Sequence, residues 1–478
     1  MNFELKTQNS WSSFSAGCSS LEKGGCLLLA RFGTVLENRF HLKAHGTRVR
    51  TEVLAGVTTF LGLSYIIFVQ PAVLATTGMD FGAVMAATCL ASAFATLIMA
   101  LYANYPIALA PGMGHNVFFA FTVCGTAAAG GMGMPWQTAL AGVFVSGVVF
   151  LLLSRFGFRE RLLNAIPDSQ KHAIAVGIGL LIAFIGVQWA GVVVARPGIL
   201  VGLGQLGSPP VLLALFGLLV TAGLLARGNR AAILWGMLAT MLAGLPSGLV
   251  TYQGLLSVPP SLGPTLFKLD PAGLFSHQGA LLVFMFFFLA LFDTIGTLVA
   301  VGQQAGLMQD GRLPRAEKAL TADAAGMTAG SLLGTSTIVT YIESAAGVAA
   351  GGRTGLASVV TAGLFLAALF FAPLAKMIGG GYVTPEGARL YPIIAPALIL
   401  VGSFMIRSIT EVAWSDPTEA IPAFLTILLM PLTVSITDGI TFGLVSYSLL
   451  KLATGRLADA HWLIHLFAGL LALRYVLA

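Results

Sequence analysis

The chain has 478 residues, of which 57% are hydrophobic and only 9% are charged. Soluble domains have roughly 45–50% apolar and about 25% charged residues, so this composition excludes a soluble globular enzyme. The net charge of +6 does not indicate a nucleic-acid partner, because the basic residues fall between apolar stretches and form no single patch. We therefore expect a polytopic helical membrane protein that embeds in a lipid bilayer and binds no nucleic acid.

The first fifty residues are polar and mixed in composition. Their apolar run at 26–30 is shorter than the roughly 7–15 residues of a signal-peptide core, so we expect a cytoplasmic leader over 1–50 and no cleaved signal. The cysteines Cys18, Cys26, Cys89 and Cys124 show no metal-ligand spacing. We expect no metal and no cofactor.

Apolar segments follow one another from Glu52 onward. A crossing needs about 20 apolar residues, which leaves room for about 14 spans. The expected spans are 53–77, 82–103, 106–124, 136–154, 168–190, 209–226, 231–250, 278–302, 320–334, 337–350, 355–378, 391–408, 418–434 and 437–453. We expect the apolar tail at 458–478 to lie at the membrane interface, with a short extra span as the alternative.

The orientation follows from the basic residues, because cytoplasmic loops carry an excess of Lys and Arg. With the N-terminus inside and an even number of spans, the cytoplasmic set is Lys43, Arg48, Arg50, Arg155, Arg159, Arg161, Arg227, Arg230, Arg312, Arg315, Lys318, Arg353, Arg407, Lys451 and Arg456. Only Arg196, Lys268, Lys376 and Arg389 then lie outside. This bias predicts a protein of the cytoplasmic membrane with both termini inside the cell.

The third and tenth spans do not begin as good helices. Residues 105–116 contain two prolines and two glycines, and residues 335–340 form a largely β-branched run before Glu343. Broken segments at the same place in two halves are the best sequence indication of a midplane site in an inverted-repeat transporter. We therefore expect two sets of seven spans in opposite orientation, with spans 3 and 10 each broken into an extended segment and a half-helix.

Ionisable residues inside spans cost about 2.5–3.5 kcal/mol on insertion scales and are functional by default. Asp293 and Glu343 lie in or beside spans and have no evident capping role, so we assign both to the site. For Asp323 and Asp438 a structural interpretation is favoured. Asp323 falls in the first turn of span 9, where a carboxylate suits the helix dipole, and Asp438 follows Ser435 at the spacing of a capping box.

A small polar ring loses its water in such a pocket and must be hydrogen-bonded by the protein. The two carboxylates would accept from ring N–H groups, and the half-helix N-termini after Gly114 and Glu343 would donate. Asn116 suits the same wall, with helix packing as the alternative. The further candidates are Thr337 and, with a buried or packing role as the alternative, His115, Phe118, Phe119 and Phe292.

The same acids are candidates for proton coupling, because a desolvated carboxylate gains a proton more readily. We assign this role to Asp293, Glu343 and Asp323. A sodium site built from hydroxyl groups stays open as the alternative. Its candidate ligands are Thr335, Ser336, Thr337 and Thr340.

Several linked motifs resemble the AzgA-like purine permeases, which are hypoxanthine, guanine and adenine transporters of the nucleobase cation symporter class. They are TEVLAGVTTF at 51–60, YIIFVQP at 65–71, APGMG at 110–114, FDTIGT at 292–297, GTST at 334–337, ESAAGV at 343–348 and GGRTGL at 351–356. The likeness runs in unbroken order from about His41 to the C-terminus.

The resemblance implies a uracil-permease-like fold, with a core domain at 51–160 (spans 1–4) and 277–378 (spans 8–11) and a gate domain at 161–276 (spans 5–7) and 379–457 (spans 12–14). It also implies proton-coupled purine import by elevator-like alternating access. The family's acids of spans 8 and 10 fall on Asp293 and Glu343, and its asparagine of span 3 falls on Asn116. The chain departs from the family at Gln70, where asparagine is usual, and at His115, where an apolar residue is usual.

Other functions fit the sequence less well. A sulfate-type anion transporter or another nucleobase or uracil transporter is the alternative, although two acids in the site would repel an anion. An intramembrane enzyme would need a nucleophile with a base or a metal cluster, and no such spacing is present. Whether two copies form a homodimer is left open.

Overall fold

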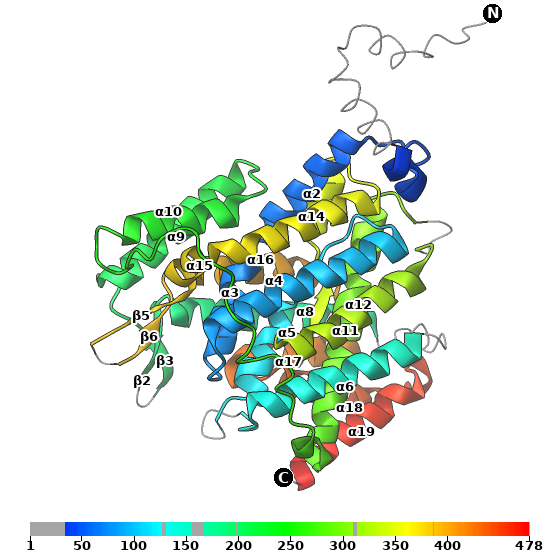
Figure 1. The fold of residues 1–478 in the computed structure, drawn as a ribbon. Helices are drawn as coiled ribbons and strands as arrows, with labels where there is room; N and C mark the ends of the chain where they lie inside the picture. Colours follow the sequence, from blue (N-terminus) through cyan, green and yellow to red (C-terminus); the bar gives the residue numbers. More distant parts are fainter. Residues whose placement is uncertain are drawn as a thin grey trace, which may run out of the picture.

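The computed structural model describes residues 34–126, 131–154, 167–196, 199–308, 313–385 and 387–477. Within these ranges the chain is predominantly helical, with three short two-stranded sheets that the all-α expectation did not include (Figure 1). Most of the predicted leader lies outside the described residues, and with it Cys18 and Cys26. The same holds for four basic residues of the predicted orientation signal, namely Arg155, Arg159, Arg161 and Arg312.

After a helix at 34–40, the elements of the first half are α2 (Val49–Leu63), α3 (Ile66–Ala75), α4 (Phe81–Ile98), η1 (Met99–Ala103), β1 (Leu109–Pro111), α5 (Met113–Val117), η2 (Phe118–Val123), α6 (Trp136–Ser154), α8 (Asp168–Trp189), β2 (Val193–Arg196), β3 (Ile199–Leu203), α9 (Pro209–Ala226) and α10 (Ala232–Gly244). Those of the second half are η4 (Ala272–Phe275), α11 (His277–Gln304), α12 (Ala316–Leu333), β4 (Ile338–Thr340), α13 (Ser344–Ala349), α14 (Gly355–Ala368), η5 (Leu369–Phe371), α15 (Ala372–Gly379), β5 (Tyr382–Val383), β6 (Arg389–Leu390), α16 (Ala395–Met405), η6 (Ile406–Glu411), α17 (Pro417–Thr433), α18 (Ile436–Ala453), η7 (Leu457–Asp459) and α19 (Trp462–Leu477).

Among the described residues, seven helical segments are long and apolar enough to cross a bilayer. They are Val49–Ala75, Phe81–Ala103, Trp136–Leu153, Asp168–Trp189, Pro209–Ala226, Gln278–Gln304 and Gly355–Gly379. Three shorter apolar helices lie at Ala232–Gly244, Pro417–Thr433 and Trp462–Leu473. The chain is therefore a multi-pass membrane protein, as its composition predicts.

Some expected spans are interrupted or displaced. The first span is two helices, α2 and α3, separated at Ser64 and Tyr65, and the eleventh breaks at η5 just before Pro373. A proline inside a helix removes one backbone hydrogen bond and crowds the preceding turn, which favours a break there. Helix α12 begins at Ala316, four residues earlier than expected, and this shift changes the interpretation of Asp323 below.

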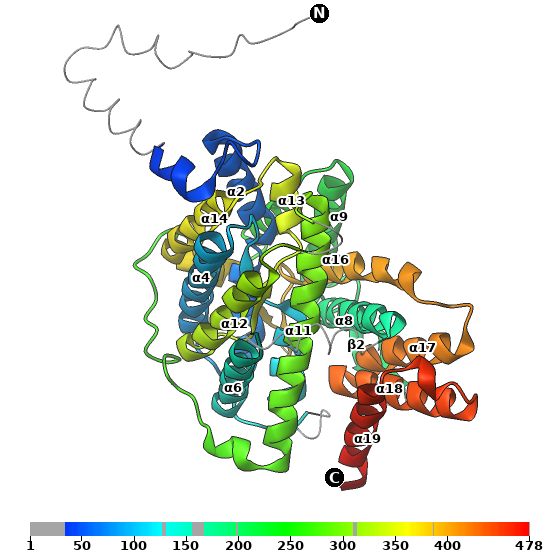
Figure 2. The same ribbon diagram turned by 90° about the vertical axis from the view of Figure 1, so that its right-hand side faces the viewer.

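The helices form two groups (Figure 2). In the first, α14 packs on α2 and α4, while α12 packs on α4 and α6. In the second, α8 packs on α16 and α17, α9 packs on α10 and α16, and α18 packs on α17 and α19. Contacts between the groups include those of α5 with α8, of η2 with α18, and of α10 with α2 and α15.

Glycines on α8 allow the second group to pack closely. A Cβ added at Gly177 would lie 2.5 Å from Sδ of Met430 on α17, and one at Gly179 would lie 2.6 Å from Cβ of Met405 on α16. Both distances are shorter than van der Waals contact. Small residues at helix interfaces let backbones approach closely in membranes, where burial from water does not drive helix association.

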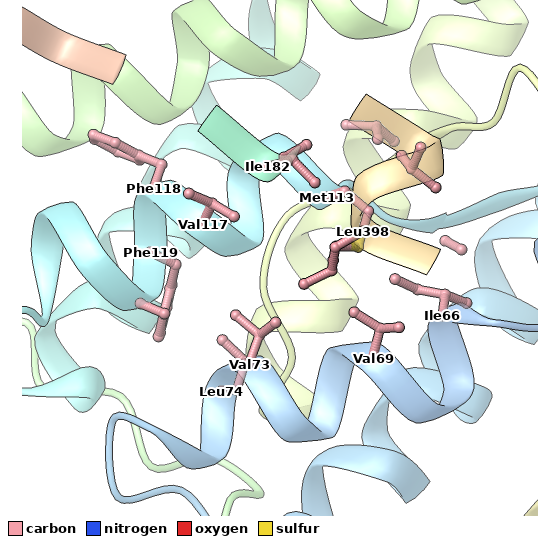
Figure 3. Close-up of a cluster of buried hydrophobic side chains, with 14 of the residues drawn as sticks. Ile66, Val69, Val73, Leu74, Met113, Val117, Phe118, Phe119, Ile182 and Leu398 are labelled. Atoms are coloured by element: carbon pink, nitrogen blue, oxygen red, sulfur yellow. The ribbon is translucent and has the colours of Figure 1, made fainter. Parts of the chain in front are cut away.

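An apolar cluster lies where the groups adjoin (Figure 3). Side chains of α3, of α5 with η2, of α8 and of α16 meet there; those labelled in the figure are Ile66, Val69, Val73, Leu74, Met113, Val117, Phe118, Phe119, Ile182 and Leu398. Phe118 and Phe119 are fully buried. The helix that follows β1 is thus held by packing on one side.

A buried carboxylate of α2 caps α14. Glu52 is fully buried, and its carboxylate oxygens accept backbone N–H groups of Arg353 at 2.8 Å, Thr354 at 3.3 Å and Ala357 at 3.2 Å. These donors lie at the N-terminus of α14, where N–H groups have no partner within the helix and the helix dipole favours negative charge. The cap fixes α14 against α2.

We expect Glu52→Ala to lower the thermal unfolding midpoint of the protein in detergent, with a loss of about 2–3 kcal/mol, because three N–H groups lose a charged acceptor. Glu52→Gln keeps one acceptor oxygen and should lose less. Glu411→Ala, at an exposed acid in η6, is the control. Equal midpoints for Glu52→Ala and the control would show that the cap does not stabilise the fold.

Candidate functional site

The two broken segments pair with each other. Strands β1 and β4 are antiparallel, and all six of their residues are buried. Two more backbone bonds of 3.0 Å extend the pair, one from Gly112 N–H to the Thr337 carbonyl and one from Tyr341 N–H to the Ala108 carbonyl. Non-helical backbone is tolerated at membrane depth only where its polar groups are satisfied by protein or by a water-filled cavity. The pairing satisfies them.

Each strand leads into a helix, as expected. Strand β1 is followed by α5 and η2, and β4 by α13, whose N-cap residue is Glu343. The expectation that α13 offers free N–H donors is wrong for its first turn. The N–H groups of Ser344, Ala345 and Ala346 bond to the carbonyls of Tyr341, Ile342 and Glu343, because the chain enters the helix through a tight turn.

Asp293 and Glu343 come together near this strand pair. Their carboxylates are close enough to interact electrostatically, and Tyr341 lies near both. The Tyr65 hydroxyl, at the break between α2 and α3, donates to Oε1 of Glu343 at 2.8 Å. The Tyr341 hydroxyl donates to the Pro111 carbonyl. Two acids and two phenol groups therefore converge from three separate segments.

The Asp293 side of α11 borders open space. The Asp293 side chain is 42% exposed although it lies far inside a 28-residue helix. A Cβ added at Gly296, one turn further on, would meet no atom within 4 Å. Glu343 is half-buried. The two acids are thus accessible, in contrast to the fully buried polar groups around them.

His115 lies beside Asp293. It is buried, and its Nδ1 is 3.6 Å from Oδ2 of Asp293. A Cβ added at Gly112 would lie 2.6 Å from that Nδ1, so only glycine leaves room for the ring. His115 is therefore buried, as the alternative interpretation expected, and it lies next to Asp293.

Asn116 belongs to a buried polar network. Its Oδ1 accepts from the Ser336 hydroxyl, and Gln70 Nε2 donates to Thr335 Oγ1 at 3.0 Å and to Ser336 Oγ at 3.1 Å. Thr88 completes the set through a 3.2 Å contact with Thr335. All five side chains are fully buried. In this structure Asn116 joins α5 to the segment before β4.

Asp323 and Asp438, the acids for which a structural role was favoured, lie in different environments. Because α12 begins at Ala316, Asp323 lies in the helix interior, and the expected place in the first turn is wrong. It is fully buried and accepts from the hydroxyl of Thr294, the neighbour of Asp293, at 2.8 Å. The capping interpretation of the Asp438 segment is confirmed in part, since Ser435 Oγ accepts the N–H of Asp438 at 3.2 Å.

The other candidates lie at different places. Gly114 faces α8, where an added Cβ would lie 2.8 Å from Cγ2 of Ile178. Phe119 is fully buried, with its ring centroid 6.3 Å from that of Phe286, which is a packing environment. Thr337 is buried, and its hydroxyl has no partner among the described residues. The Phe292 side chain lies outside the described part of the structure.

Sequence reasoning missed the phenol groups and the role of Gln70. Tyr65 and Tyr341 stand at helix interruptions, and Gln70 precedes Pro71 within an otherwise apolar buried helix. A polar residue next to a helix break in a span is a signal that could have identified each of them.

Two solved structures share the fold. The transmembrane domain of a cyanobacterial bicarbonate transporter, BicA, aligns with a TM-score of 0.58 at 15% identity, covering 82% of this chain and 97% of that one. The overall structure of SLC26A9 aligns with a TM-score of 0.56 at 11% identity, covering 94% of this chain and 73% of that one. At these identities the likeness concerns the fold alone.

Closer relatives cover nearly the whole chain. It is 50% identical over 443 residues to the putative permease MJ0326 of Methanocaldococcus jannaschii, covering 92% of this chain and 98% of that protein. It is 43% identical to the adenine permease AdeP of Escherichia coli, with 92% and 96% covered. It is 44% identical to the guanine/hypoxanthine permease PbuG of Bacillus subtilis, with 88% and 95% covered.

A family comparison agrees with these relatives. The model of the Permease family matches residues 50–442, which is most of the chain. Relatives named as permeases, not as enzymes, agree with the expectation that the chain transports a solute. The chain belongs to the Permease family, and the likeness of its motifs to AzgA-like purine permeases is confirmed.

Proposed function

We propose that this protein imports purine nucleobases, adenine, guanine or hypoxanthine, across the cytoplasmic membrane. The observation that carries the proposal is the convergence of Asp293, Glu343 and the Tyr65 hydroxyl beside the strand pair of the broken segments. Relatives over 40% identical are named adenine and guanine/hypoxanthine permeases, which supports this substrate class.

The proposed recognition follows from the chemistry of the ring. A purine presents N–H donors and ring-nitrogen or carbonyl acceptors in one plane, and each of these must replace its lost water in the site. Glu343 would accept from N–H groups of the ring. The Tyr65 hydroxyl would keep its bond to Glu343 Oε1 and orient the carboxylate, leaving Oε2 for the substrate. The first N–H groups of α13 are already hydrogen-bonded within the chain. The acceptor atoms of the purine ring would therefore have to bond to donors on the β1–α5 side.

We further propose that a proton is the coupling ion and that Asp293 carries it. A charged carboxylate within a membrane costs about 2.5–3.5 kcal/mol on insertion scales, and protonation removes this cost. Repulsion between Asp293 and Glu343 adds to it. Asp323 on α12 accepts a hydrogen bond from Thr294, the neighbour of Asp293 on α11. Through this bond a change in the charge of Asp293 would be transmitted to α12. A sodium site at Thr335–Thr337 is the alternative.

The proposed architecture is fourteen spans in a 7+7 inverted repeat. The antiparallel pairing of β1 with β4, from corresponding places in the two halves, supports opposite orientations of those halves. We assign 51–160 and 277–378 to the core domain and 161–276 and 379–457 to the gate domain, and the packing of the helices in two groups supports this division. Elevator-like movement of the core past the gate would change which side of the membrane the acids face.

The contacts between the groups suit such a movement. Gly114 lets α5 lie directly on Ile178 of α8. Because glycine has no side chain to interlock with α8, α5 could slide along that helix. Arg230, in the loop before α10, donates to the Ala346 carbonyl of α13 at 3.1 Å. An exposed hydrogen bond of this kind has a small net free energy and can break and re-form.

The basic residues support cytoplasmic termini. Lys43, Arg48 and Arg50 precede the first span, Lys451 lies in the last turn of α18, and Arg456 follows that helix. An anion transporter of the sulfate type, the alternative that shares the fold, is disfavoured by the two accessible acids, which would repel its substrate.

We expect Glu343→Gln to weaken purine binding by about 10–100-fold, because a charged acceptor is replaced by a neutral amide. Uptake of radiolabelled hypoxanthine and adenine by cells that express the variant measures this effect, with surface abundance measured in parallel. Glu411→Gln, at an exposed acid, is the matched control. Unchanged uptake in Glu343→Gln would remove this residue from the site, and competition by uracil but by no purine would contradict the proposed substrate class.

We expect a protonophore to abolish purine accumulation at constant sodium, and Asp293→Asn to make uptake independent of the pH gradient. Exchange of external for internal purine should persist in Asp293→Asn, because exchange needs no net proton movement. Replacing sodium by choline is the control. Accumulation that survives the protonophore and fails in choline would show that sodium is the coupling ion.

A further inference from the structure

The Asp293 carboxylate is free to turn. Its side chain is 42% exposed and forms no hydrogen bond with any other described residue. In the part of the chain that the structure describes, no Lys or Arg forms an ion pair with it either. The carboxylate can therefore rotate between the open side of α11 and the protein interior.

The His115 ring beside it is held in place. Only 3% of its side chain is exposed, and it is hydrogen-bonded to the backbone carbonyl of Leu289, one turn before Asp293 on α11. The room for the ring depends on Gly112, where an added Cβ would lie 2.6 Å from Nδ1 of His115 and 3.3 Å from Oδ2 of Asp293. A fixed ring nitrogen thus faces a carboxylate that can move.

The hydrogen bond to Leu289 determines how the ring can interact with Asp293. A carbonyl oxygen only accepts, so the ring nitrogen that faces Leu289 carries the N–H. Nδ1 is the nitrogen on the Asp293 side, so the N–H belongs to Nε2 and Nδ1 carries a lone pair. A neutral ring in this form can accept a hydrogen bond from a protonated carboxyl group, but it offers no donor to an ionised one.

The two protonation states of Asp293 therefore differ in stability beside this ring. When Asp293 is protonated, a small rotation of its carboxyl group shortens the 3.6 Å separation to an O–H···Nδ1 hydrogen bond. When Asp293 is ionised, two acceptors face each other in a largely buried place. An imidazolium beside an ionised Asp293 would place two charges within a span, where each charge is costly.

The other ionisable groups around the pair bring no positive charge against it among the described residues. Glu343 and Tyr341 lie near Asp293, and Tyr65 donates to Glu343. Elements α3, α6 and η2, which pack near the pair, contain no ionisable residue. The remaining groups are Asp168, Lys171 and His172 near the start of α8, and Glu317, Lys318 and Asp323 on α12, where Asp323 is bonded to Thr294.

We propose that His115 is a positioning residue for proton coupling, because its neutral ring accepts the hydrogen bond of protonated Asp293 and holds the proton on that carboxyl group. The inference rests on the proposed proton symport. Rotation of the carboxyl group toward the open side of α11 breaks the O–H···Nδ1 bond. The proton then leaves Asp293 on the open side, and none is transferred to the ring.

The first test is the dependence of hypoxanthine uptake on external pH in His115→Phe, which keeps a planar ring but lacks the acceptor. Without the hydrogen bond Asp293 loses its proton more easily, so we expect the pH of half-maximal uptake to fall by about one unit, a tenfold change in proton affinity. His115→Gln, whose amide oxygen can accept, should restore part of this shift. His172→Phe, at a partly buried histidine of α8, is the matched control and should keep the profile of the unaltered protein.

A second measurement separates this inference from the proposed function. Infrared difference spectra of the purified protein without substrate record the carboxyl C=O stretch of Asp293, which is identified by its loss in Asp293→Asn. We expect this band to disappear about one pH unit lower in His115→Phe than in the unaltered protein. Equal titration in the two proteins would overturn the pairing even if protons drive purine uptake. A band that persists to higher pH in the variant would also overturn it, because His115 would then be a cation.

Failure of the proposed function gives a different result, in which purine uptake is absent or survives the protonophore while the infrared shift remains. The unfolding midpoint of each variant checks that it folds. If His115→Phe does not fold, His115→Leu removes the acceptor with a smaller side chain and is subject to the same two measurements and the same contradicting outcomes.

Discussion

The structure depends on one constraint, which is that no backbone polar group can be left unpaired in the membrane interior. Two spans give up helical hydrogen bonds over several residues, and they are stable because β1 and β4 exchange those bonds with each other. The strand pair forces both interruptions to the same depth. It also ties the two halves of the chain together at the place where polar side chains are least costly, because the non-helical backbone there is already covered by protein.

The polar groups of the site follow from this arrangement. Around the strand pair, the fully buried side chains Gln70, Asn116, Thr335 and Ser336 bond to one another and fix the segments that carry the strands. The half-exposed side chains Asp293 and Glu343 border this network. The buried set therefore gives rigidity, and the accessible set is the one to which we assign substrate binding in the proposal above. Asn116 is an example of a residue whose chemistry suits a ligand and whose contacts in this structure are all internal.

Glycine residues also determine how closely neighbouring helices pack. On α8 it brings two neighbouring helices within the second group into close contact, whereas Gly114 brings α5 of the first group onto α8. The same residue type thus tightens the packing inside a group and keeps the boundary between groups smooth. Gly112 serves neither purpose, because it makes room for the His115 ring beside Asp293.

The sequence by itself determined the membrane class and the two broken segments, and it predicted that Asp293 and Glu343 belong to the site. These properties are local, because hydropathy, proline and glycine content, and the cost of a charge in a span can be read within about twenty residues. Only the tertiary structure decided which groups meet. Tyr65 and Glu343 are 278 residues apart, Gln70 and Thr335 are 265 apart, and Glu52 caps a helix that begins some 300 residues later. Asp323 was misplaced because a shift of four residues in a helix start converts a first-turn carboxylate into a buried one, and local sequence patterns do not define helix ends to that precision.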